Sequence, residues 1–390
     1  MAKKVLMACY SFWNSPFQIG SHHIARNFLD LGYEVAFLSS PITPLHFLQG
    51  LSSDLKEKYI NYFNGGSRES NERLWYYVPC SLITAQNKIL LKAGYRAEKF
   101  MAENWWKFCF PNILKKIKEN GFMEVDLIYF DNCYYYFLLD YIKAKKKIFR
   151  VVDYNSDYAS STKTGYEFEK KVASVVDCVL YTAHSLKDYV ERLGSNKTLY
   201  FPNGVNYKHF VNSNHELPPE YLKINKPIII YVGAMEEWFD FDLVNLASEK
   251  LIDFSFVFIG SDKLARQKLI IRNNVHILGC RKYSEIPKYI WNADIGIIPF
   301  DVKKHPNLVN CINPLKLYEY MACGLPTIAT KWHELELMKT PAVLYENFDE
   351  FLIEIKKFSS TTIDRQKLSD YAANFDWNKK VYELETFLGI

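Results

Sequence analysis

The sequence lacks several features that would point to particular classes of protein. Its eight cysteines are scattered, with no Cys-x-x-Cys pair and no nearby histidine at a metal-ligand spacing, so neither a disulfide framework nor a zinc site is indicated. No uninterrupted apolar run approaches the ~20 residues that span a bilayer, and the opening run Val5 to Cys9 is too short for a signal peptide. We therefore expect a cytoplasmic protein, at most peripheral on the inner face of the cell membrane.

A strong excess of charge of one sign is also missing. The chain has 48 Lys and Arg against 44 Asp and Glu, a net charge of +4, and the excess forms no single basic tract. Nucleic acid is therefore not an expected partner. No Gly-x-Gly-x-x-Gly follows the first apolar segment, where Ala8-Cys9-Tyr10-Ser11-Phe12 stands, and this argues against a nicotinamide dehydrogenase.

The 390 residues do contain a regular alternation of short apolar runs and helical patterns. This alternation is typical of parallel strands joined by crossover helices, and the length favours two domains. The segment 51–93 shows no clear element. Strands are predicted at 4–9, 34–38, 126–131, 148–152, 179–182 and 198–201, then at 228–232, 255–259, 275–278, 295–299 and 327–330; helices of the first half are predicted at 22–31, 96–119, 134–145, 166–176 and 185–193.

The polar segment 212–226, with Pro218-Pro219, has the composition of a linker. We therefore predict an N-terminal Rossmann-like domain over 1–206, a linker over 207–226 and a C-terminal Rossmann-like domain over 227–375. Residues 376–390 are predicted as a helix that can cross back to the first domain. The fold class is α/β, with two Rossmann-like domains facing across a cleft.

Two features of the second half suggest where a ligand binds. Gly233, Gly260 and Gly279 each end a predicted strand, and ligands of open parallel sheets bind outside the carboxyl ends of the strands. Lys316 follows Asn313-Pro314 in the first turn of a predicted helix, where the helix dipole disfavours a cation unless an anion such as a diphosphate binds there. The alternatives are turn-forming glycines and a solvated pair of Lys316 with Glu319.

The segment from Pro314 to Thr330 resembles the donor-site signature of GT-B glycosyltransferases. Similar matches occur at Ile19 to His23, Phe201 to Asn206, Tyr231 to Ala234 and Asn292 to Gly296. The pattern from Ala234 to Asp240 is more similar to bacterial polysaccharide enzymes, including glycosyl transferase group 1 and glucuronosyltransferase-like members.

The resemblance implies a nucleotide-sugar donor, expected to be UDP-linked. Glu319 would bind the ribose hydroxyls, and a cation near Lys316 or in the loop at Arg281 and Lys282 would meet the diphosphate. No Asp-x-Asp follows a strand in the second half, so no metal or other cofactor is expected. The implied donor-binding residues are Gly233, Glu236, Arg281, Lys282, Asn313, Lys316, Leu317 and Glu319, and the implied acceptor-binding residues are Gly20, His22 and His23.

The reaction expected from the resemblance is transfer of a hexosyl or glycuronosyl group to a saccharide or lipid-linked saccharide in surface polysaccharide synthesis. Many retaining members carry a glutamate where Cys311 stands, which favours inversion. Inversion needs a base, and Asp153 and Asp157, after a predicted strand, are the candidates; turn or capping roles are the alternative. A sugar-nucleotide epimerase of the same architecture and a non-catalytic binding subunit also remain open.

Aromatic residues make up 16% of the chain and include Trp105-Trp106 beside Lys107, not far from Lys115-Lys116. Such a group suits a membrane-surface helix or a platform for a sugar. The same residues are as readily explained as core with a snorkelling rim. From the first explanation we predict salt-sensitive association with an anionic membrane.

Overall fold

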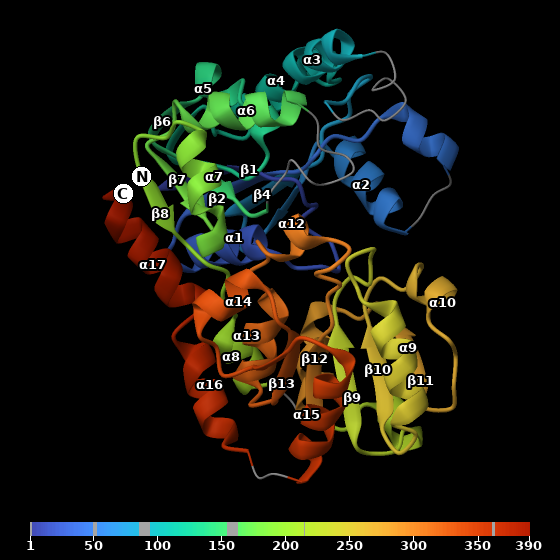
Figure 1. The fold of residues 1–390 in the computed structure, drawn as a ribbon. Helices are drawn as coiled ribbons and strands as arrows, with labels where there is room; N and C mark the ends of the chain where they lie inside the picture. Colours follow the sequence, from blue (N-terminus) through green and yellow to red (C-terminus); the bar gives the residue numbers. More distant parts are fainter. Residues whose placement is uncertain (1, 50–52, 86–93, 154–162, 214, 361–362) are drawn as a thin grey trace. The chain divides into compact units, whose positions relative to one another are not determined.

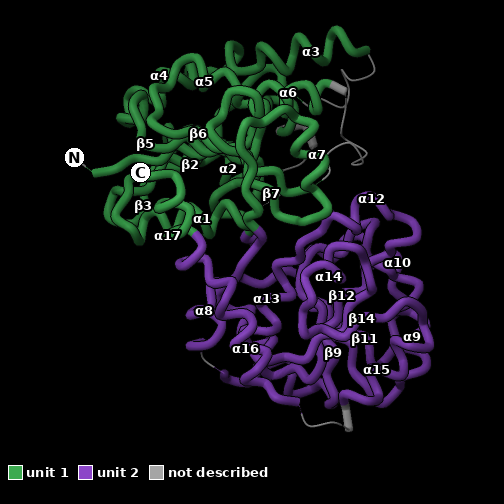
Figure 2. The backbone as a smooth tube through the Cα atoms, turned by 60° about the vertical axis from the view of Figure 1, so that its left-hand side comes forward, with its two compact units in different colours: residues 1–15, 19–201, 381–390 green, residues 16–18, 202–380 purple. Residues whose placement is uncertain are grey.

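A computed structural model describes residues 2–49, 53–85, 94–153, 163–213, 215–360 and 363–390. The chain divides into two compact units, shown in different colours in Figure 2. Unit 1 holds Met1–Ser15, Ile19–Phe201 and Val381–Ile390, and unit 2 holds Pro16–Gln18 and Pro202–Lys380. Each unit is an α/β structure built on one mainly parallel sheet (Figure 1), as the alternation of elements predicts.

Unit 1 has its strands in the order β3-β4-β2-β1-β5-β6-β7-β8, parallel except for the β3–β4 pair. The chain builds outward from β1 through β2 and β4, then returns to place β5 on the other side of β1. The switch point, where ligands of such sheets bind, is therefore between β1 and β5. The strands are β1 Lys4–Ala8, β2 Glu34–Leu38, β3 Ser67–Glu69, β4 Leu74–Tyr77, β5 Glu124–Phe130, β6 Lys143–Val151, β7 Cys178–Tyr181 and β8 Thr198–Tyr200.

The helices of unit 1 differ from the predictions in two places. The predicted helix 96–119 is broken, because Pro111 lacks a backbone N–H and Asn112 starts a new helix by accepting from Lys115 N at 3.1 Å. The predicted helix 134–145 is replaced by short turns and by the start of β6. The helical segments are α1 Gly20–Asp30, η1 Pro44–Gln49, α2 Ser53–Phe63, α3 Tyr95–Asn104, η3 Trp105–Phe108, α4 Ile113–Glu119, η4 Cys133–Tyr135, α5 Leu138–Tyr141, α6 Lys163–Ala173, η6 His184–Leu186 and α7 Lys187–Arg192.

In two parts of unit 1 the sequence pattern does not predict the observed strands. The lysine-rich start of β6 is extended because it pairs with β5, where Lys145 Nζ lies 2.6 Å from Asp126 Oδ1. The segment 51–93, which shows no clear pattern, contains α2, β3 and β4 among its described residues. Tertiary pairing, rather than local periodicity, decides both segments.

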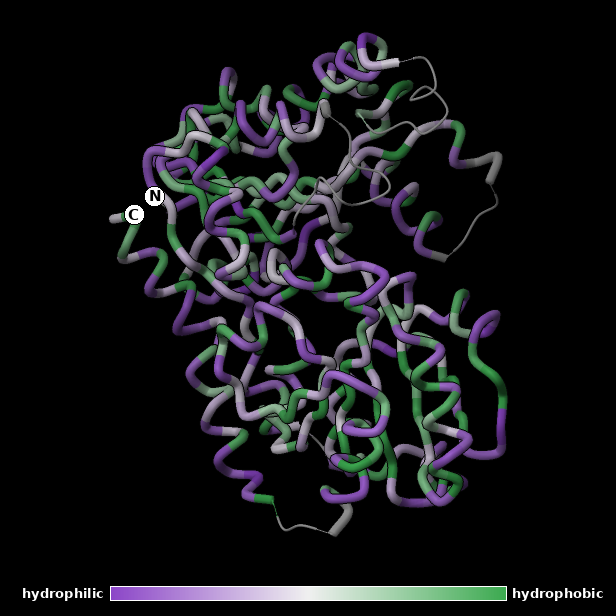
Figure 3. The backbone as a smooth tube through the Cα atoms, viewed as in Figure 1, coloured by the Kyte–Doolittle hydropathy of each residue, from purple (hydrophilic) through white to green (hydrophobic). Residues whose placement is uncertain are grey.

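Unit 2 has its strands in the order β11-β10-β9-β12-β13-β14, all parallel. β9 and β10 are buried along their whole length and appear as hydrophobic strands in Figure 3, as expected for a parallel sheet covered on both faces. β14 is an addition to the predicted strands. The elements are α8 Tyr207–Val211, η7 Pro219–Lys223, β9 Ile228–Val232, α9 Phe241–Lys250, β10 Ser255–Ile259, α10 Ala265–Lys268, β11 Val275–Gly279, η8 Tyr283–Glu285, α11 Ile286–Trp291, β12 Ile295–Ile298, α12 Pro306–Val309, α13 Leu315–Ala322, β13 Thr327–Thr330, α14 His333–Met338, β14 Val343–Tyr345, α15 Phe348–Ser360 and α16 Arg365–Ala373.

The segment 207–226, predicted as a linker, belongs to unit 2 and carries α8 and η7. It is fixed there by hydrogen bonds, from Trp291 Nε1 to Phe210 O at 2.7 Å and from Tyr221 OH to Tyr289 O at 3.2 Å. The last helix, α17 Trp377–Leu388, starts in unit 2 and ends among residues of unit 1.

Candidate functional site

The helix α13 forms the centre of the predicted donor site. Gly324, at its C-terminal end, has a φ of +64°, the left-handed conformation that glycine adopts most easily there. Pro314 is the N-cap residue, and the helix begins at Leu315. Asn313 does not cap the helix: its side-chain oxygen accepts from Asn203 N and from Tyr318 OH, both at 3.1 Å. Asn313 therefore fixes the start of α13 against the chain entering unit 2.

Lys316 is a half-buried cation in the first turn of α13. Its Nζ lies 4.9 Å from the ring centre of Phe300 and 5.2 Å from that of Tyr231. Among the described residues it makes no hydrogen bond or ion pair within 4 Å. Burial lowers its pKa from 10.5 to about 8, although the negative charge of Glu319 acts in the opposite direction. A buried ammonium without a bonded partner is costly, so this position suits the binding of an anion.

Glu319 lies one turn further along the same helix and is also half-buried. Burial raises its pKa from 4.5 to about 7, and the charge of Lys316 opposes this shift. The two side chains are separated by three positions, which places them on one side of the helix. At neutral pH the pair thus offers a cation and a partly ionised carboxylate in one place.

The glycines after β9 and β10 let the strand ends approach each other closely. Gly233 and Gly260 have φ values of +145° and +142°, which disfavour any other residue. A Cβ atom on Gly260 would lie 1.9 Å from Gly233 O, and one on Gly233 would lie 3.0 Å from Lys316 Cε. Gly260 is therefore required by packing, and Gly233 leaves the space that the Lys316 side chain occupies.

The remaining predicted donor residues have different surroundings. Glu236 accepts from Ser261 Oγ at 3.4 Å, between the segments that follow β9 and β10. Lys282 is exposed, and its backbone N–H donates to a side chain of the next turn. Leu317 has no exposed surface and packs in the core of unit 2, so its side chain cannot contact a donor.

Arg281 has a structural environment that the sequence did not indicate. Its Nη2 lies 2.8 Å from Glu220 Oε1, its Nε donates to Tyr289 OH at 3.0 Å, and its Nη1 donates to Leu278 O at 2.6 Å. The guanidinium thus connects η7, α11 and the end of β11. Of the three cations predicted at the diphosphate, Arg281 is paired with Glu220 and Lys282 is exposed, whereas Lys316 is half-buried with no bonded partner among the described residues.

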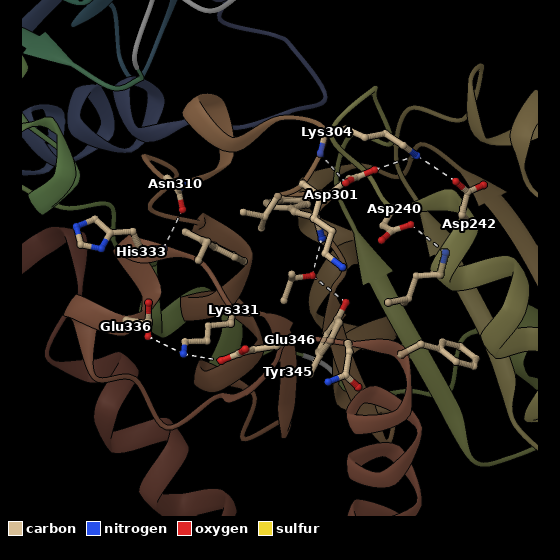
Figure 4. Close-up of a pocket in the computed structure, with 18 of the residues that line it drawn as sticks. Asp240, Asp242, Asp301, Lys304, Asn310, Lys331, His333, Glu336, Tyr345 and Glu346 are labelled. Atoms are coloured by element: carbon tan, nitrogen blue, oxygen red, sulfur yellow. Dashed lines mark hydrogen bonds and ion pairs between the residues drawn. The ribbon is translucent and has the colours of Figure 1, made fainter.

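A cavity of about 650 Å³ lies beside this cluster in unit 2 (Figure 4). Phe300 lines the cavity and also contacts Lys316 through its ring. Lys304 pairs with Asp301 at 3.1 Å, and Lys331 pairs with two glutamates at 2.7 and 3.0 Å. None of the predicted donor residues lines the cavity, and these charged walls are paired within the protein.

The predicted acceptor residues of unit 1 are buried. His22 Nδ1 accepts from Ile19 N at 3.1 Å, and Nε2 lies 2.9 Å from Phe12 O, so both ring nitrogens are used within the unit. Burial lowers the pKa of His22 to about 4, which keeps the ring neutral. His23 is 2% exposed. His22 thus helps to fix the start of α1, and the assignment of Gly20, His22 and His23 to acceptor binding stays a prediction.

Gly20 is also explained by packing in unit 1. A Cβ atom at this position would lie 2.6 Å from Nη1 of Arg150, a buried residue of β6. Glycine at the start of α1 therefore makes room for the guanidinium of a neighbouring strand. This role does not require an acceptor.

The first candidate base, Asp153, lies two residues after the end of β6 and is half-buried. Asp157 falls outside the described residues. A neighbouring carboxylate, Asp131 at the end of β5, is buried: it accepts from Tyr10 N at 2.9 Å and from the hydroxyl of Ser21. Burial raises the pKa of Asp131, while these hydrogen bonds and the charge of Arg150 oppose the shift. Asp131 is thus an internal structural group, and Asp153 keeps access to solvent.

Comparison with known proteins matches both units to models of glycosyltransferases. Residues 7–182 match the model of the N-terminal domain of the glucuronosyltransferase GumK, and residues 226–359 match the model of glycosyl transferases group 1. Sucrose-phosphate synthase from Thermosynechococcus elongatus superposes with a TM-score of 0.68 at 15% identity, covering 99% of this chain and 98% of that one. The chain belongs to the GT-B glycosyltransferases.

Two further relatives of this GT-B chain are informative. Anabaena HepE, solved in complex with UDP and glucose, has a TM-score of 0.64 at 13% identity and covers the whole of both chains. A Bacillus subtilis (strain 168) protein named "Putative teichuronic acid biosynthesis glycosyltransferase TuaH" is 25% identical over 249 residues, 57% of this chain. The aligned part spans 62% of that relative.

The N-terminal unit of this GT-B chain has a small pocket that the sequence did not reveal. It has a volume of about 140 Å³ and is lined by Tyr10, Ser40, His46 and Asn132, among others. These residues follow β1, β2 and β5, so the pocket lies at the switch point of the sheet. Asn132 Nδ2 donates to Ser40 Oγ at 3.2 Å, and His46 Nδ1 accepts from a backbone N–H at 3.0 Å. Tyr10 and Asn132, each directly after a predicted strand, could have been found from the sequence.

Within the described residues of this GT-B chain, His, Cys, Asp and Glu side chains form no group of three that could bind a metal ion. The expectation that no metal is used stays a prediction. Nor does any described helix combine the length and apolar character needed to cross a bilayer.

Proposed function

We propose that this chain transfers a sugar from a UDP-linked donor to a saccharide or lipid-linked saccharide acceptor in polysaccharide synthesis. The observation that carries the proposal is the half-buried pair of Lys316 and Glu319 on α13. It lies in the unit that matches the group 1 glycosyltransferases, and its cation is not paired by the protein. TuaH is named for teichuronic acid biosynthesis, which supports a saccharide acceptor. HepE was solved in complex with UDP and glucose, which supports a UDP-linked donor.

In the proposed donor complex, the Lys316 ammonium neutralises the diphosphate near the N-terminal end of α13. An anion at this position raises the pKa of Lys316 back toward its ordinary value, because the charged form gains a partner. The ionised carboxylate of Glu319 accepts hydrogen bonds from the ribose hydroxyls. Gly233, without a side chain, allows the donor to approach the end of β9.

For the transfer step we propose inversion with an aspartate base. Asp153, or Asp157 as the second candidate, takes the proton from an acceptor hydroxyl as its oxygen attacks the anomeric carbon. The bond from that carbon to the diphosphate breaks, and UDP leaves with the bonding electrons. Cys311 in the place of the retaining glutamate supports this choice. The switch-point pocket of unit 1, with its hydroxyl, amide and imidazole groups, is our candidate for the acceptor subsite.

Two other functions make different experimental predictions. A sugar-nucleotide epimerase would convert its substrate without any acceptor. A non-catalytic subunit would turn over nothing and would bind nucleotide weakly. Neither alternative is favoured by a specific observation in the structure.

The proposal is tested with the whole chain and a panel of nucleotide sugars. Ligands that bind the folded state raise its unfolding temperature, so thermal shift first identifies the donor, and chromatography then follows its consumption with and without saccharide acceptors. We expect acceptor-dependent release of UDP that persists in EDTA, and a product with inverted anomeric configuration. Conversion without acceptor would support the epimerase. Absence of both thermal shift and turnover across the panel would refute the proposal.

A further inference from the structure

The tryptophans expected at a membrane surface are buried in unit 1. Trp105 has no exposed surface, and its Nε1 donates to Tyr134 O at 3.0 Å. Trp106 is 9% exposed, and its ring stacks on Phe137 with centres 4.7 Å apart. These two rings are core residues, so they cannot form the surface predicted from the sequence.

Other apolar side chains close to them are exposed instead. We call Phe63, Leu82, Phe108 and Phe110 the phenylalanine patch; their exposed fractions are 72%, 66%, 39% and 81%. Single exposed apolar residues are common on soluble proteins, whereas a contiguous group marks an interaction site. The exposure is therefore significant only if the four residues lie together.

Hydrogen bonds bring the three segments of the patch side by side. Leu82 N donates to Phe108 O at 3.2 Å, and Phe110 N donates to the carbonyl of Cys80 at 3.1 Å. Tyr62 OH, next to Phe63 on α2, donates to Phe110 O at 2.6 Å. The end of α2, the segment after β4 and the segment after η3 thus form one surface.

The chain around this patch is basic. From Trp105 to Glu119 it contains Lys107, Lys115, Lys116 and Lys118 against one glutamate, a net charge of +3. The side chain of Lys115 is 72% exposed, and Lys116 Nζ lies close to the end of α2, 3.1 Å from where a Cβ of Gly65 would be. Lys115 and Lys116 Nζ lie 3.9 and 3.0 Å from the carboxylate of Glu119, which leaves the segment its net positive charge. Exposed apolar side chains beside a basic segment match the two layers of a bilayer surface with anionic headgroups.

We propose that the phenylalanine patch and its lysines contact an anionic membrane. The proposal builds on the lipid-linked acceptor class of the proposed function, although its test does not need catalysis. Two segments contribute to both the patch and the switch-point pocket. Thr84, which lines the pocket, lies two positions after Leu82 of the patch, and Trp105, which also lines the pocket, lies three positions before Phe108. A membrane at the patch would place lipid headgroups near the candidate acceptor subsite of the same unit.

The test is sedimentation of the whole chain with phosphatidylcholine vesicles, with and without phosphatidylglycerol, at low and high salt. We expect binding that requires phosphatidylglycerol and weakens with salt. The double variant Phe63→Ser/Phe110→Ser should bind about 10-fold or more weakly, because the apolar contribution is lost. The variant Lys115→Glu/Lys118→Glu should lose affinity for phosphatidylglycerol vesicles by a similar factor.

Matched controls come from unit 2. Leu222 and Ile252 are 75% and 74% exposed, so Leu222→Ser/Ile252→Ser removes comparable surface far from the patch in sequence. Lys263, exposed in unit 2, provides Lys263→Glu as the charge control. Both controls should bind vesicles like the unmodified chain.

Three outcomes would overturn the proposal. The first is no binding of the unmodified chain to phosphatidylglycerol vesicles at low salt. The second is equal loss of binding in patch variants and controls. The third is concentration-dependent self-association that the Phe63→Ser/Phe110→Ser variant abolishes while its vesicle binding is unchanged, which would assign the patch to a second copy of the chain. UDP affinity of each variant, measured by calorimetry, separates these results from failure of the donor site.

Discussion

Replacing Lys316 with methionine should stabilise the empty protein while weakening nucleotide binding. The pKa of this lysine falls from 10.5 to about 8 on folding, which corresponds to about 3 kcal/mol of lost stability near pH 7, at about 1.4 kcal/mol for each pKa unit. The sign follows from the protons bound: between these two pKa values the unfolded chain holds the proton more tightly, so the cost is present below pH 8 and disappears as pH rises toward 10.5.

Methionine keeps most of the volume and loses the charge. The contacts of the ammonium with the rings of Phe300 and Tyr231 contribute about 0.5 to 1 kcal/mol each in the opposite direction. We therefore expect a net gain of about 1 to 2 kcal/mol in the free energy of unfolding, seen in calorimetry as a rise of a few degrees in the transition of unit 2.

The affinity for UDP should fall about 10- to 100-fold, which corresponds to the loss of a charge-assisted hydrogen bond of about 1.5 to 3 kcal/mol. Lys250→Met, at an exposed position of α9, is the matched control. Unchanged UDP affinity in Lys316→Met would refute the donor-site assignment, and a lower transition temperature would refute the assigned cost of burial.

Three further substitutions test neighbouring parts of the argument. The pKa of Glu319 is raised from 4.5 to about 7, so the unmodified chain loses stability as pH rises through this interval. Glu319→Gln should remove this loss. The melting temperatures of the variant and the unmodified chain, measured at several pH values, should therefore agree only at low pH. Arg281→Ala should lower the transition temperature of unit 2 yet change UDP affinity less than 3-fold, since its charge is already paired; a larger loss by calorimetry would return Arg281 to the diphosphate. Asp153→Asn should leave UDP binding intact and reduce turnover about 100-fold or more, and a near-normal rate in a transfer assay would exclude it as the base.

The sequence predicted those parts of the fold that depend on strong local patterns. The central strands β1, β9 and β10 are near-continuous apolar runs and lie where expected. The end of α13 is likewise determined locally, by Gly324. The lysines at the start of β6 were predicted wrongly, as part of a helix, because they become extended only through pairing with β5. β4 was not predicted, because its place in the sheet depends on pairing with β2.

The residues of the candidate site could likewise be predicted only where a local rule applies. The position of Lys316 was found because a cation in the first turn of a helix contradicts a simple electrostatic rule. His22 and Arg281 were chosen by motif position, and their actual partners, Phe12 and Glu220, could not be known from the sequence. The switch-point pocket is built from five separate segments, and none of them has a distinctive motif.

Two buried titratable residues, Asp131 in unit 1 and Lys316 in unit 2, both have pKa values shifted by burial, but their partners differ. In unit 1, Asp131 is buried among groups that stabilise its charge: the N–H of Tyr10, the hydroxyl of Ser21 and the nearby Arg150. In unit 2, Lys316 is held near two aromatic rings with no bonded anion among the described residues, and its pKa is lowered as a result. Titratable groups with shifted pKa values concentrate at functional sites. In the proposed donor complex a diphosphate supplies the anion that Lys316 lacks among the described residues, and both the N-terminal end of α13 and Gly233 at the end of β9 suit its approach.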